Sequence, residues 1–363
     1  MNETPTTSLP LLLSPSTTKP VVDEFIVSRL TLRRDQAQQI EPSYAYLWQA
    51  ILDLFQAGGK RLRPFMTIVA FQAFSDAEIS AVLPAAAAEE LLHLAMLIHD
   101  DIIDRDTIRY GVKNISGSFY EHYETLVHNE RDRHHFSDSA AILAGDLLIA
   151  EAFTLLAESD CDTECILAAT KILHTSIFGV VGGELLDTEA SFKKLASAPP
   201  LLIAEYKTAS YSFVGPLTLG ATLAGATETD LQGLKEYAKL LGIGYQIRDD
   251  VIGVFGDETV TGKSTDSDIT EGKRTILTDE FLRLATPEQK ELYRHTFGNH
   301  HATDEAITAL KIAFKESGAL DATEVQISHF AEQAAVALAQ LTIPAVQHQA
   351  LAHLITLCTQ RDK

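Results

Sequence analysis

The sequence predicts an all-α fold. Apolar residues recur at the three- to four-residue spacing of helices along most of the chain, and alternating β-branched runs are few. These segments begin at Ser, Thr or Asp caps or carry a proline in the first turn, as in Leu83-Pro84 and Thr286-Pro287. Neither a repeat of fixed period nor a sharp change of composition divides the chain. We therefore expect one large helical domain.

The helices are expected to follow an N-terminal arm. Residues 1–20 are rich in Ser, Thr and Pro and predict a flexible arm, so the domain is assigned to residues 21–363. Helical patterns then occur at Tyr44–Gln56, Pro64–Phe74, Pro84–Asp104, Ala140–Ala157, Asp162–Leu186, Pro200–Ala224, Thr229–Phe255, Asp279–Leu284, Pro287–Phe297, Asp304–Glu316 and Ala322–Leu341.

The segment from Tyr120 to Ser137 interrupts this pattern. It contains four histidines among charged residues: His122, His128, His134 and His135. Because His134 and His135 are adjacent, they point in different directions on any regular element, which disfavours a metal site. We expect a polar surface loop.

Composition excludes several classes of partner. The 363 residues include 50 acidic and 29 basic side chains, a net charge of −21, which disfavours nucleic acid because phosphate backbones need a basic surface. We expect no apolar stretch to reach the roughly 18 to 20 residues of a membrane span, and the N-terminus shows no secretory leader pattern. Cys161, Cys165 and Cys358 form no CxxC pair and are expected to be structural. We expect a cytoplasmic protein.

Asp100, Asp101 and Asp104 end an apolar run from Leu91 to His99. On a helix these three positions share one face, because residues three and four apart are neighbours. Such a face is commonly solvated, but the preceding run is apolar on nearly all sides, and Ile102 and Ile103 are expected to continue the burial. Clustered carboxylates beside buried turns need a cation, and oxygen ligands suit Mg²⁺ that also coordinates substrate phosphates. A second pair, Asp249-Asp250, follows Gln246 far downstream.

Basic residues occur near these acidic motifs. The segment Gly58-Gly59-Lys60-Arg61-Leu62-Arg63-Pro64 places glycines and cations before a helix start, where backbone N–H groups and side chains together bind anions. Lys207-Thr208 opens an apolar helix, and Lys263 and Lys273 follow the second acidic pair. Carboxylates and cations together predict a site for metal ions and a diphosphate.

These motifs resemble the all-trans isoprenyl diphosphate synthases, the polyprenyl synthetase family that includes geranylgeranyl and farnesyl diphosphate synthases. The resemblance runs from about Gly58 to Lys273 in the family's order: GGKRLRP, HDDIIDRD, GDLL at Gly145–Leu148, GGELLD at Gly182–Asp187, KT at 207–208, and YQIRDD followed by TGK and EGKR. Each motif alone is weak, whereas six in the same order are highly specific.

The resemblance implies a fold, a site and a reaction. The fold is an isoprenoid synthase-type bundle of long helices around a central active-site cavity, commonly in homodimers. Asp100, Asp104 and Asp249 would bind Mg²⁺, three ions per site, with Asp101 and Asp250 supporting them. The allylic diphosphate would be held by Arg109, Lys207 with Thr208, Gln246, Lys263 and Lys273, and isopentenyl diphosphate by Lys60, Arg63 and His93. The allylic diphosphate would ionise, and isopentenyl diphosphate would attack the resulting cation.

Two positions depart from the family pattern. Tyr110 follows Arg109 where paired arginines are usual, which changes one expected contact with isopentenyl diphosphate. Gly253 occupies the place where a third aspartate is common in the second motif, and Asp257 is a candidate to replace its charge.

The length of the product is assigned to the wall before Asp100. An isoprene unit is about as long as a helical turn of ~5.4 Å, so Ala95 and Met96, one turn before the motif, and Leu91 and Leu92, one turn deeper, set where the tail stops. An aromatic residue five positions before the motif typically limits this family to farnesyl products, whereas Ala95 leaves that turn open. We expect geranylgeranyl diphosphate, with a farnesyl or longer product as the alternative.

Two other classes of protein are less consistent with the motifs. A terpene cyclase shares the fold but carries an NDxxSxxxE second motif, unlike the segment Gln246–Asp250 with its lysines. A non-catalytic partner subunit or helical scaffold is expected to lack one Asp motif or the lysines.

Overall fold

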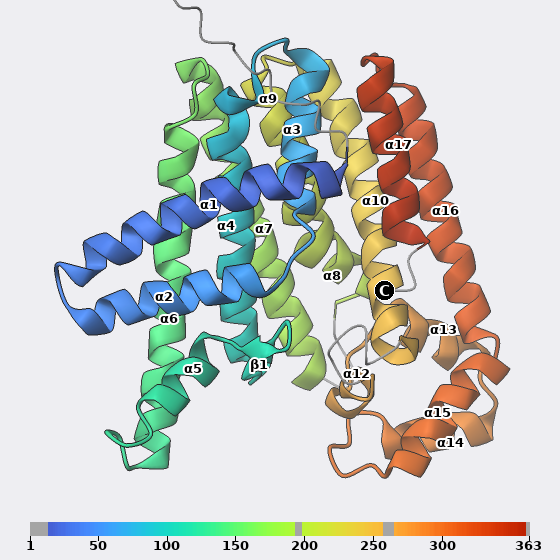
Figure 1. Cartoon of the computed structure of the whole chain (residues 1–363). Coiled ribbons are helices and arrows are strands. Elements are labelled where there is room, and N and C mark those ends of the chain that lie inside the picture. The colour runs from blue at the N-terminus through green and yellow to red at the C-terminus, as the bar shows by residue number, and fades with distance from the viewer. Residues whose placement is uncertain (1–13, 193–197, 257–264, 361–363) are drawn as a thin grey trace, which may run out of the picture. The chain divides into compact units, whose positions relative to one another are not determined.

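The computed structural model describes residues 14–192, 198–256 and 265–360 (Figure 1). The chain forms two compact units: Met1–Leu173 with Thr218–Ala226, and His174–Leu217 with Thr227–Lys363. Two of the boundaries fall inside helices, in α7 (Thr163–Phe192) and α9 (Gly215–Leu223). The units are therefore not consecutive domains joined by linkers, and a single domain stays a prediction.

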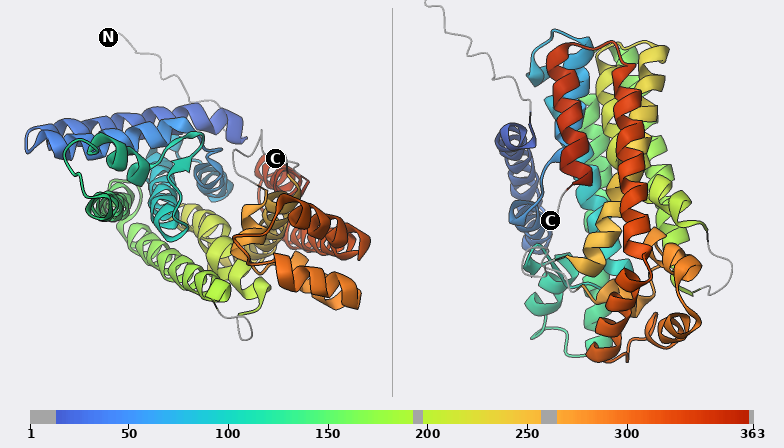
Figure 2. Two further views of the ribbon diagram at one scale, coloured as in Figure 1. Left: turned by 90° about the horizontal axis from the view of Figure 1, so that it is seen from below. Right: turned by 90° about the vertical axis from the view of Figure 1, so that its right-hand side faces the viewer.

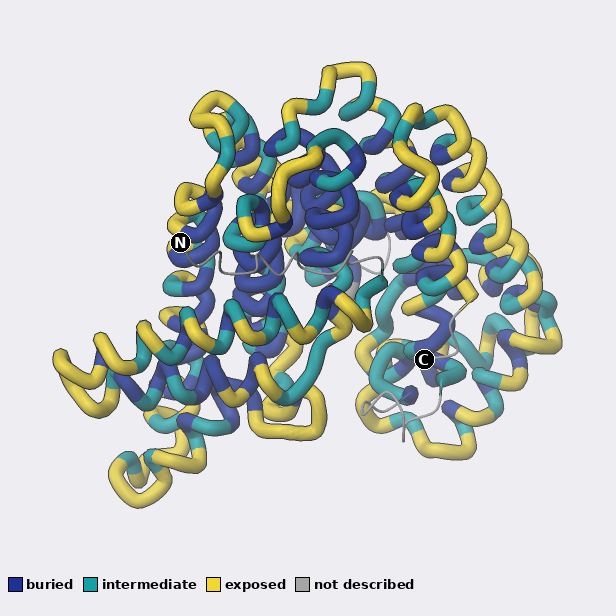
Figure 3. The backbone as a smooth tube through the Cα atoms, turned by 45° about the horizontal axis from the view of Figure 1, so that its top comes forward, coloured by how far each residue is buried: buried dark blue, intermediate teal, exposed yellow. Residues whose placement is uncertain are grey.

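Unit 1 is built around the helix α4 (Ile79–Ile103), which packs against α1 (Pro15–Gln38), α3 (Leu62–Phe74) and α6 (Glu130–Ala157). The unit also contains α2 (Pro42–Ala57) and α5 (Ile115–His122), with a hairpin of β1 (Ile108–Arg109) and β2 (Val112–Lys113). α1 runs beside α2, and α4 packs along α3 and α6 (Figure 1). The residues of α3 and of the middle of α4 are buried nearly all round, including the alanines 85–88. Figure 3 marks buried residues along the backbone in dark blue.

A glycine of the GDLL segment makes room for the side chain of His99. A Cβ atom at Gly145 would lie 2.1 Å from Nε2 of His99, the residue before the first acidic motif. A larger residue at this position would have to displace the His99 ring. The GDLL segment of α6 therefore lies directly beside the residue that precedes Asp100.

Unit 2 surrounds one central helix, α10 (Glu228–Phe255). α10 packs against the π-helix η1 (Ala204–Val214), α16 (Ala319–Ala339) and α17 (Ala345–Thr359), and both views of Figure 2 show the last two beside it. The remaining elements are α8 (Pro200–Ile203), α12 (Ser267–Glu271), α13 (Ile276–Leu284), α14 (Pro287–Thr296) and α15 (Asp304–Glu316). Leu277, Phe281, Leu310 and Phe314 form the core of α13 and α15.

The all-α fold class is confirmed, and the differences are local. α1 begins at Pro15, after a capping box made by Ser14, so residues 15–20 belong to a helix and not to the expected arm. The sequence analysis also missed α5, α12 and α17. Within Tyr120–Ser137, α5 ends at His122 and α6 begins at Glu130, so the expected loop is only the short connection between two helices.

Two of the histidines of that segment, His122 and His134, pack on aromatic rings. The His122 ring stacks on Tyr46 at 4.0 Å and the His134 ring lies 4.4 Å from Tyr120, between ring centroids. These contacts join α5 to α2 and to α6. They stabilise helices in a segment whose polar composition predicted a loop.

Three helices are long and apolar enough to cross a membrane by length and composition: Ile79–Ile103, Glu130–Ala157 and Thr163–Ala190. The expectation that no stretch reaches this length was wrong, because it required an uninterrupted apolar run. In the first helix 72% of the most apolar window is buried inside the protein, but only 28% in the third. Burial therefore explains the apolar α4, whereas α7 keeps an apolar surface.

Candidate active site

The first acidic motif lies at the C-terminal end of α4. Asp100 and Asp101 are in the last turn, and Asp104 is the residue that ends the helix, with its N–H bonded to the Asp100 carbonyl at 2.8 Å. Asp101 is 2% exposed, whereas Asp104 is exposed. Ile103 is 44% exposed, so burial does not continue between the carboxylates as expected. Of the three carboxylates, one is thus buried and two are more accessible.

Arg109 neutralises the buried member of this motif. Its Nε donates to Asp101 Oδ1 at 2.6 Å, and its Nη2 donates to Asp100 Oδ2 at 3.1 Å. Burial raises the pKa of Asp101, and the ion pair with Arg109 opposes that shift. Burial alone would lower the pKa of Arg109, but the two aspartates hold it well above its usual value. Arg109 reaches them because the β1–β2 hairpin turns back beside α4.

The glycine-rich basic loop is held in place by Arg61. This guanidinium is 4% exposed and donates to Asp23 at 2.6 Å, to Glu90 at 2.9 Å and to the Phe55 carbonyl at 2.8 Å. Arg61 therefore has a structural role. The residues predicted to bind the anion are the neighbouring cations Lys60 and Arg63. Lys60 is exposed, and Arg63 lies half-buried in the first turn of α3.

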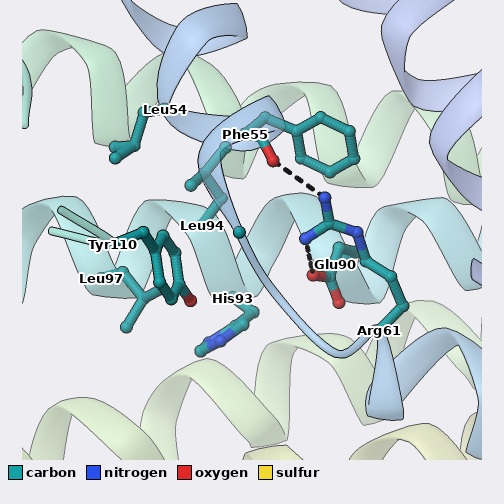
Figure 4. A pocket seen from close by; sticks show the side chains of 9 residues that line it. Leu54, Phe55, Arg61, Glu90, His93, Leu94, Leu97 and Tyr110 are labelled. Carbon is teal, nitrogen blue, oxygen red and sulfur yellow. Dashed lines mark hydrogen bonds and ion pairs between the residues drawn. The ribbon is translucent and has the colours of Figure 1, made fainter. Parts of the chain in front are cut away.

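A small pocket lies between this loop and α4 (Figure 4). Its polar lining comes from Arg61, Glu90, His93 and Tyr110, and Leu54, Phe55, Gly58, Leu94 and Leu97 complete it. The pKa of His93 lies well below its ordinary value. Burial is the main cause, and the nearby cations Arg63, Arg109 and Arg61 lower the pKa further. The imidazole is therefore neutral, so it can form hydrogen bonds but does not act as a cation.

The residues assigned to product length all lie on α4. Leu91, Leu92 and Ala95 are 0% exposed, and Met96 is half-buried. None of the four lines the pocket of Figure 4. Their role as a wall stays a prediction.

In unit 2, glycines hold the segment that carries Lys207 and Thr208. A Cβ at Gly183 would lie 2.2 Å from the backbone nitrogen of Lys207, and one at Gly242 would lie 2.6 Å from Cα of Ala209. α7 and α10 thus touch the η1 backbone directly. The expectation that Lys207 opens a helix was wrong: it lies inside an 11-residue π-helix, a geometry that is frequent at functional sites.

Lys207 forms ion pairs with two carboxylates of the GGELLD motif, for which no role was predicted. Its Nζ lies 2.9 Å from Glu184 Oε2 and 2.6 Å from Asp187 Oδ2. Burial opposes ionisation of Asp187, but Lys207 and Lys273 together lower its pKa below the usual value. The sequence could have indicated this pair, because Glu184 and Asp187 are three residues apart and therefore share one face of a helix.

The second acidic pair repeats the arrangement of the first. Asp249 is exposed, whereas Asp250 is 7% exposed. Gln246 donates to Asp250 Oδ1 at 2.8 Å and accepts from Thr208, and Lys273 Nζ lies 3.6 Å from Asp250 Oδ1. Burial raises the pKa of Asp250 to about 7, against the opposing effect of Lys273. In each unit, an accessible aspartate is thus followed by a buried aspartate, and a cationic side chain lies beside the buried one.

Asp268 on α12 accounts for the glycine in the second motif. A Cβ at Gly253 would lie 2.3 Å from Oδ2 of Asp268, so this carboxylate occupies the space of a side chain there. Asp268 is also the main cause of the strongly raised pKa of Lys273. Asp268 was not predicted from the sequence. The residue suggested in its place, Asp257, lies outside the described residues, as does Lys263.

The carboxylates suit Mg²⁺ shared with a substrate. Among the described residues no three His, Cys, Asp or Glu side chains lie close enough to hold a metal ion by themselves. Mg²⁺ is usually bound by one or two carboxylates together with substrate phosphates, so a complete cage of protein ligands is not required. The more accessible aspartates, Asp100 and Asp104 in unit 1 and Asp249 in unit 2, can each supply such a ligand.

Comparison with known proteins agrees with this site. The family described as Polyprenyl synthetase matches residues 45–313. The chain belongs to the polyprenyl synthetase family. A short chain isoprenyl diphosphate synthase of Methanocaldococcus jannaschii is 36% identical over 72% of this chain and 74% of its own length. A geranylgeranyl diphosphate synthase of Methanosarcina mazei is 34% identical over 76% of this chain and 78% of its own length.

A solved structure extends the likeness over most of the chain. A geranylgeranyl pyrophosphate synthase of Corynebacterium glutamicum, complexed with isoprenyl diphosphate and magnesium, has a TM-score of 0.85 and 30% identity. The match covers 94% of this polyprenyl synthetase and 98% of the other chain. The predicted family, fold class and enzyme class are confirmed, whereas the roles of individual site residues stay predictions.

Proposed function

We propose that this polyprenyl synthetase is a trans-prenyltransferase that condenses isopentenyl diphosphate with an allylic diphosphate and releases geranylgeranyl diphosphate. The observation that carries this proposal is the arrangement common to both acidic motifs. Asp101 and Asp250 are buried beside Arg109 and Lys273, while Asp100 and Asp249 remain accessible to a ligand. The allylic substrate is dimethylallyl, geranyl or farnesyl diphosphate.

Each group of residues has a task in that reaction. Asp100, Asp104 and Asp249 hold Mg²⁺, for which we propose three ions, and bound Mg²⁺ supplies stabilisation of the negative charge on the departing diphosphate. Arg109, Lys207, Lys273 and Lys263 bind the same diphosphate, with Gln246 and Thr208 orienting it. These cations lower the cost of breaking the allylic C–O bond, because they stabilise the charge that develops on the leaving group.

Lys60, Arg63 and the neutral His93 hold isopentenyl diphosphate. Its double bond attacks the allylic cation, and loss of a proton gives a product five carbons longer. Two diphosphates repel each other, so binding them together is a large part of the catalysis. Ala95 is a small residue at the position where an aromatic side chain typically limits the family to farnesyl products, which favours the geranylgeranyl product over the farnesyl alternative. A longer product is the other outcome of the assay.

An apolar face of α7 in unit 2 supports the proposal of a homodimer. Phe178, Val181 and Leu185 lie at spacings of three and four residues and are 75%, 56% and 69% exposed. A large exposed apolar face on a helix is typical of a surface that a partner covers. We propose a second copy of this chain as that partner.

We propose a cytoplasmic location. The three cysteines, none of them in a disulfide, favour a reducing compartment over a secreted location.

The test is incubation of the purified protein with Mg²⁺, labelled isopentenyl diphosphate and each allylic primer in turn, followed by chromatography of the products. The proposal predicts a labelled C20 diphosphate that requires Mg²⁺. A cyclised hydrocarbon would support a terpene cyclase instead, and a lack of both products would leave the non-catalytic partner subunit.

A further inference from the structure

Tyr110 has a backbone conformation that tyrosine rarely adopts. The β1–β2 register pairs Arg109 with Val112, so Tyr110 and Gly111 form a two-residue turn. Their φ angles are +54° and +75°, as in the hairpin turns that prefer Asn-Gly or Asp-Gly. A bulky side chain in the left-handed region costs free energy, and such residues persist where the surrounding structure compensates.

The compensation is the contact between the Tyr110 ring and Gly58. A Cβ at Gly58 would lie 2.6 Å from Cγ and 2.7 Å from Cδ1 of the ring, so the ring occupies the space beside this glycine. Figure 4 shows Tyr110 beside His93, with Arg61 and Glu90 across the pocket. The ring thus covers the first residue of the basic loop, and burial raises the pKa of its hydroxyl group.

The same loop is fixed at its other end. Arg61 is bonded to α1 through Asp23, to α4 through Glu90 and to the end of α2 through the Phe55 carbonyl. Gly59, with φ of +106°, and Lys60 lie between the ring at Gly58 and the guanidinium at Arg61. The conformation of this segment therefore depends on both contacts.

From this arrangement, and resting on the proposed function, we propose that Tyr110 is a positioning residue for isopentenyl diphosphate. Its ring holds Gly58, and through Gly58 it holds Lys60 and Arg63 in the conformation that binds this diphosphate. The neighbouring Arg109 contacts Asp100 and Asp101, so one hairpin supports both the acidic motif and the basic loop. The aromatic ring is the group required, and the hydroxyl is not.

Steady-state kinetics of Tyr110→Asn test this role. Asparagine tolerates the left-handed backbone but has no ring. We expect the KM for isopentenyl diphosphate to rise about tenfold, equivalent to about 1.4 kcal/mol, with the KM for the allylic primer within about twofold. Tyr110→Phe keeps the ring and is expected to restore the wild-type KM. Val112→Asn, on the same hairpin at a position 41% exposed, is the matched control and is expected to change neither KM.

Three results would overturn the proposal: an unchanged KM for isopentenyl diphosphate in Tyr110→Asn, an equal rise in both KM values, or a Phe variant as impaired as the Asn variant. A second measurement does not need activity. Trypsin cleavage after the exposed Lys60 is expected to be faster in Tyr110→Asn than in wild type and Val112→Asn at equal helix content by circular dichroism. Equal cleavage rates contradict the role of the ring. Absence of prenyl products from the wild type would instead contradict the proposed function itself.

Discussion

Glu89 and Glu90 are adjacent buried carboxyl groups on α4, and they differ in whether a partner stabilises them. Glu90 accepts a hydrogen bond of 2.9 Å from Arg61, whereas neither carboxyl oxygen of Glu89 has a hydrogen-bond partner among the described residues. Glu89 is 0% exposed, and burial raises its pKa to about 8, with Arg63 opposing the shift. Glu89 is therefore protonated at neutral pH.

Glu89→Gln is expected to stabilise the protein at alkaline pH. A carboxyl whose pKa is raised from 4.5 to about 8 holds its proton more tightly in the folded state than in the unfolded chain. Folded stability is therefore lost as pH rises between these values, by up to about 1.4 kcal/mol per pH unit. Glutamine has the same shape and does not titrate. We expect its thermal midpoint to match wild type near pH 5 and to exceed it increasingly up to pH 8.5.

The neighbouring Glu90→Gln is the contrasting variant. It removes one partner of a buried ion pair, which costs about 3 to 5 kcal/mol, so its midpoint should fall across the same pH range. An equal pH response of wild type and Glu89→Gln would contradict the raised pKa of Glu89.

Arg109→Gln is expected to weaken both folding and metal binding. Asp101 is 2% exposed and would lose its charge partner, which destabilises the fold by about 3 kcal/mol or more. With Asp101 no longer held, Asp100 would be less well oriented toward Mg²⁺. We expect a lower thermal midpoint and a higher Mg²⁺ concentration for half-maximal rate. A fall in the midpoint with an unchanged Mg²⁺ dependence would show that Arg109 acts on stability alone.

Adjacent glycines of α7 should respond differently to alanine. At Gly183 a Cβ would lie 2.2 Å from the Lys207 backbone nitrogen, whereas at Gly182 it would meet no atom within 4 Å. Gly183→Ala must push η1 and Lys207 away, so we expect kcat/KM for the allylic substrate to fall about a hundredfold, since small misplacements of positioning groups cost this much. Gly182→Ala should keep the wild-type value. Equal kinetics in the two variants would contradict the placement of Lys207 by this contact.

Ala95→Phe is expected to shorten the product. A phenyl ring one turn before Asp100 would block the tail after the farnesyl stage, while overpacking this fully buried site costs about 1 to 3 kcal/mol. Ala86→Phe, at another fully buried alanine of α4, is the control for overpacking and should leave the product unchanged. Chromatography of the reaction products distinguishes the two. Unshortened products from Ala95→Phe would show that α4 does not form the wall at this position.

The sequence was sufficient for the parts of the fold that follow from local pattern. The long apolar helices and the order of the motifs predicted the all-α class and the family. The Ser, Thr and Pro content of residues 15–20 predicted an arm where α1 begins, and no helix was predicted for the rest of α1 although Val22, Ile26 and Leu30 recur at four-residue spacing. α17 was also missed, although Leu351, Leu354 and Cys358 show helical spacing.

The partners of the site residues could not be predicted, because they depend on contacts between distant segments. Asp268 reaches Gly253 only once α12 packs against α10. No local pattern distinguished Arg61, which holds the loop through three buried contacts, from Lys60 and Arg63 beside it. The π-helix around Lys207 likewise follows from its packing against Gly183 and Gly242 and not from its own sequence.

The central claim is that accessible aspartates of both motifs bind the metal ions that activate an allylic diphosphate. The most direct measurement is the Mg²⁺-dependent rate of prenyl product formation in Asp100→Asn and Asp249→Asn, with Asp35→Asn as the control, because Asp35 is an exposed carboxylate paired only on the surface with Arg34. We predict that each motif variant loses at least about a hundredfold in kcat and that the control keeps the wild-type rate. Wild-type rates in either motif variant would contradict the account.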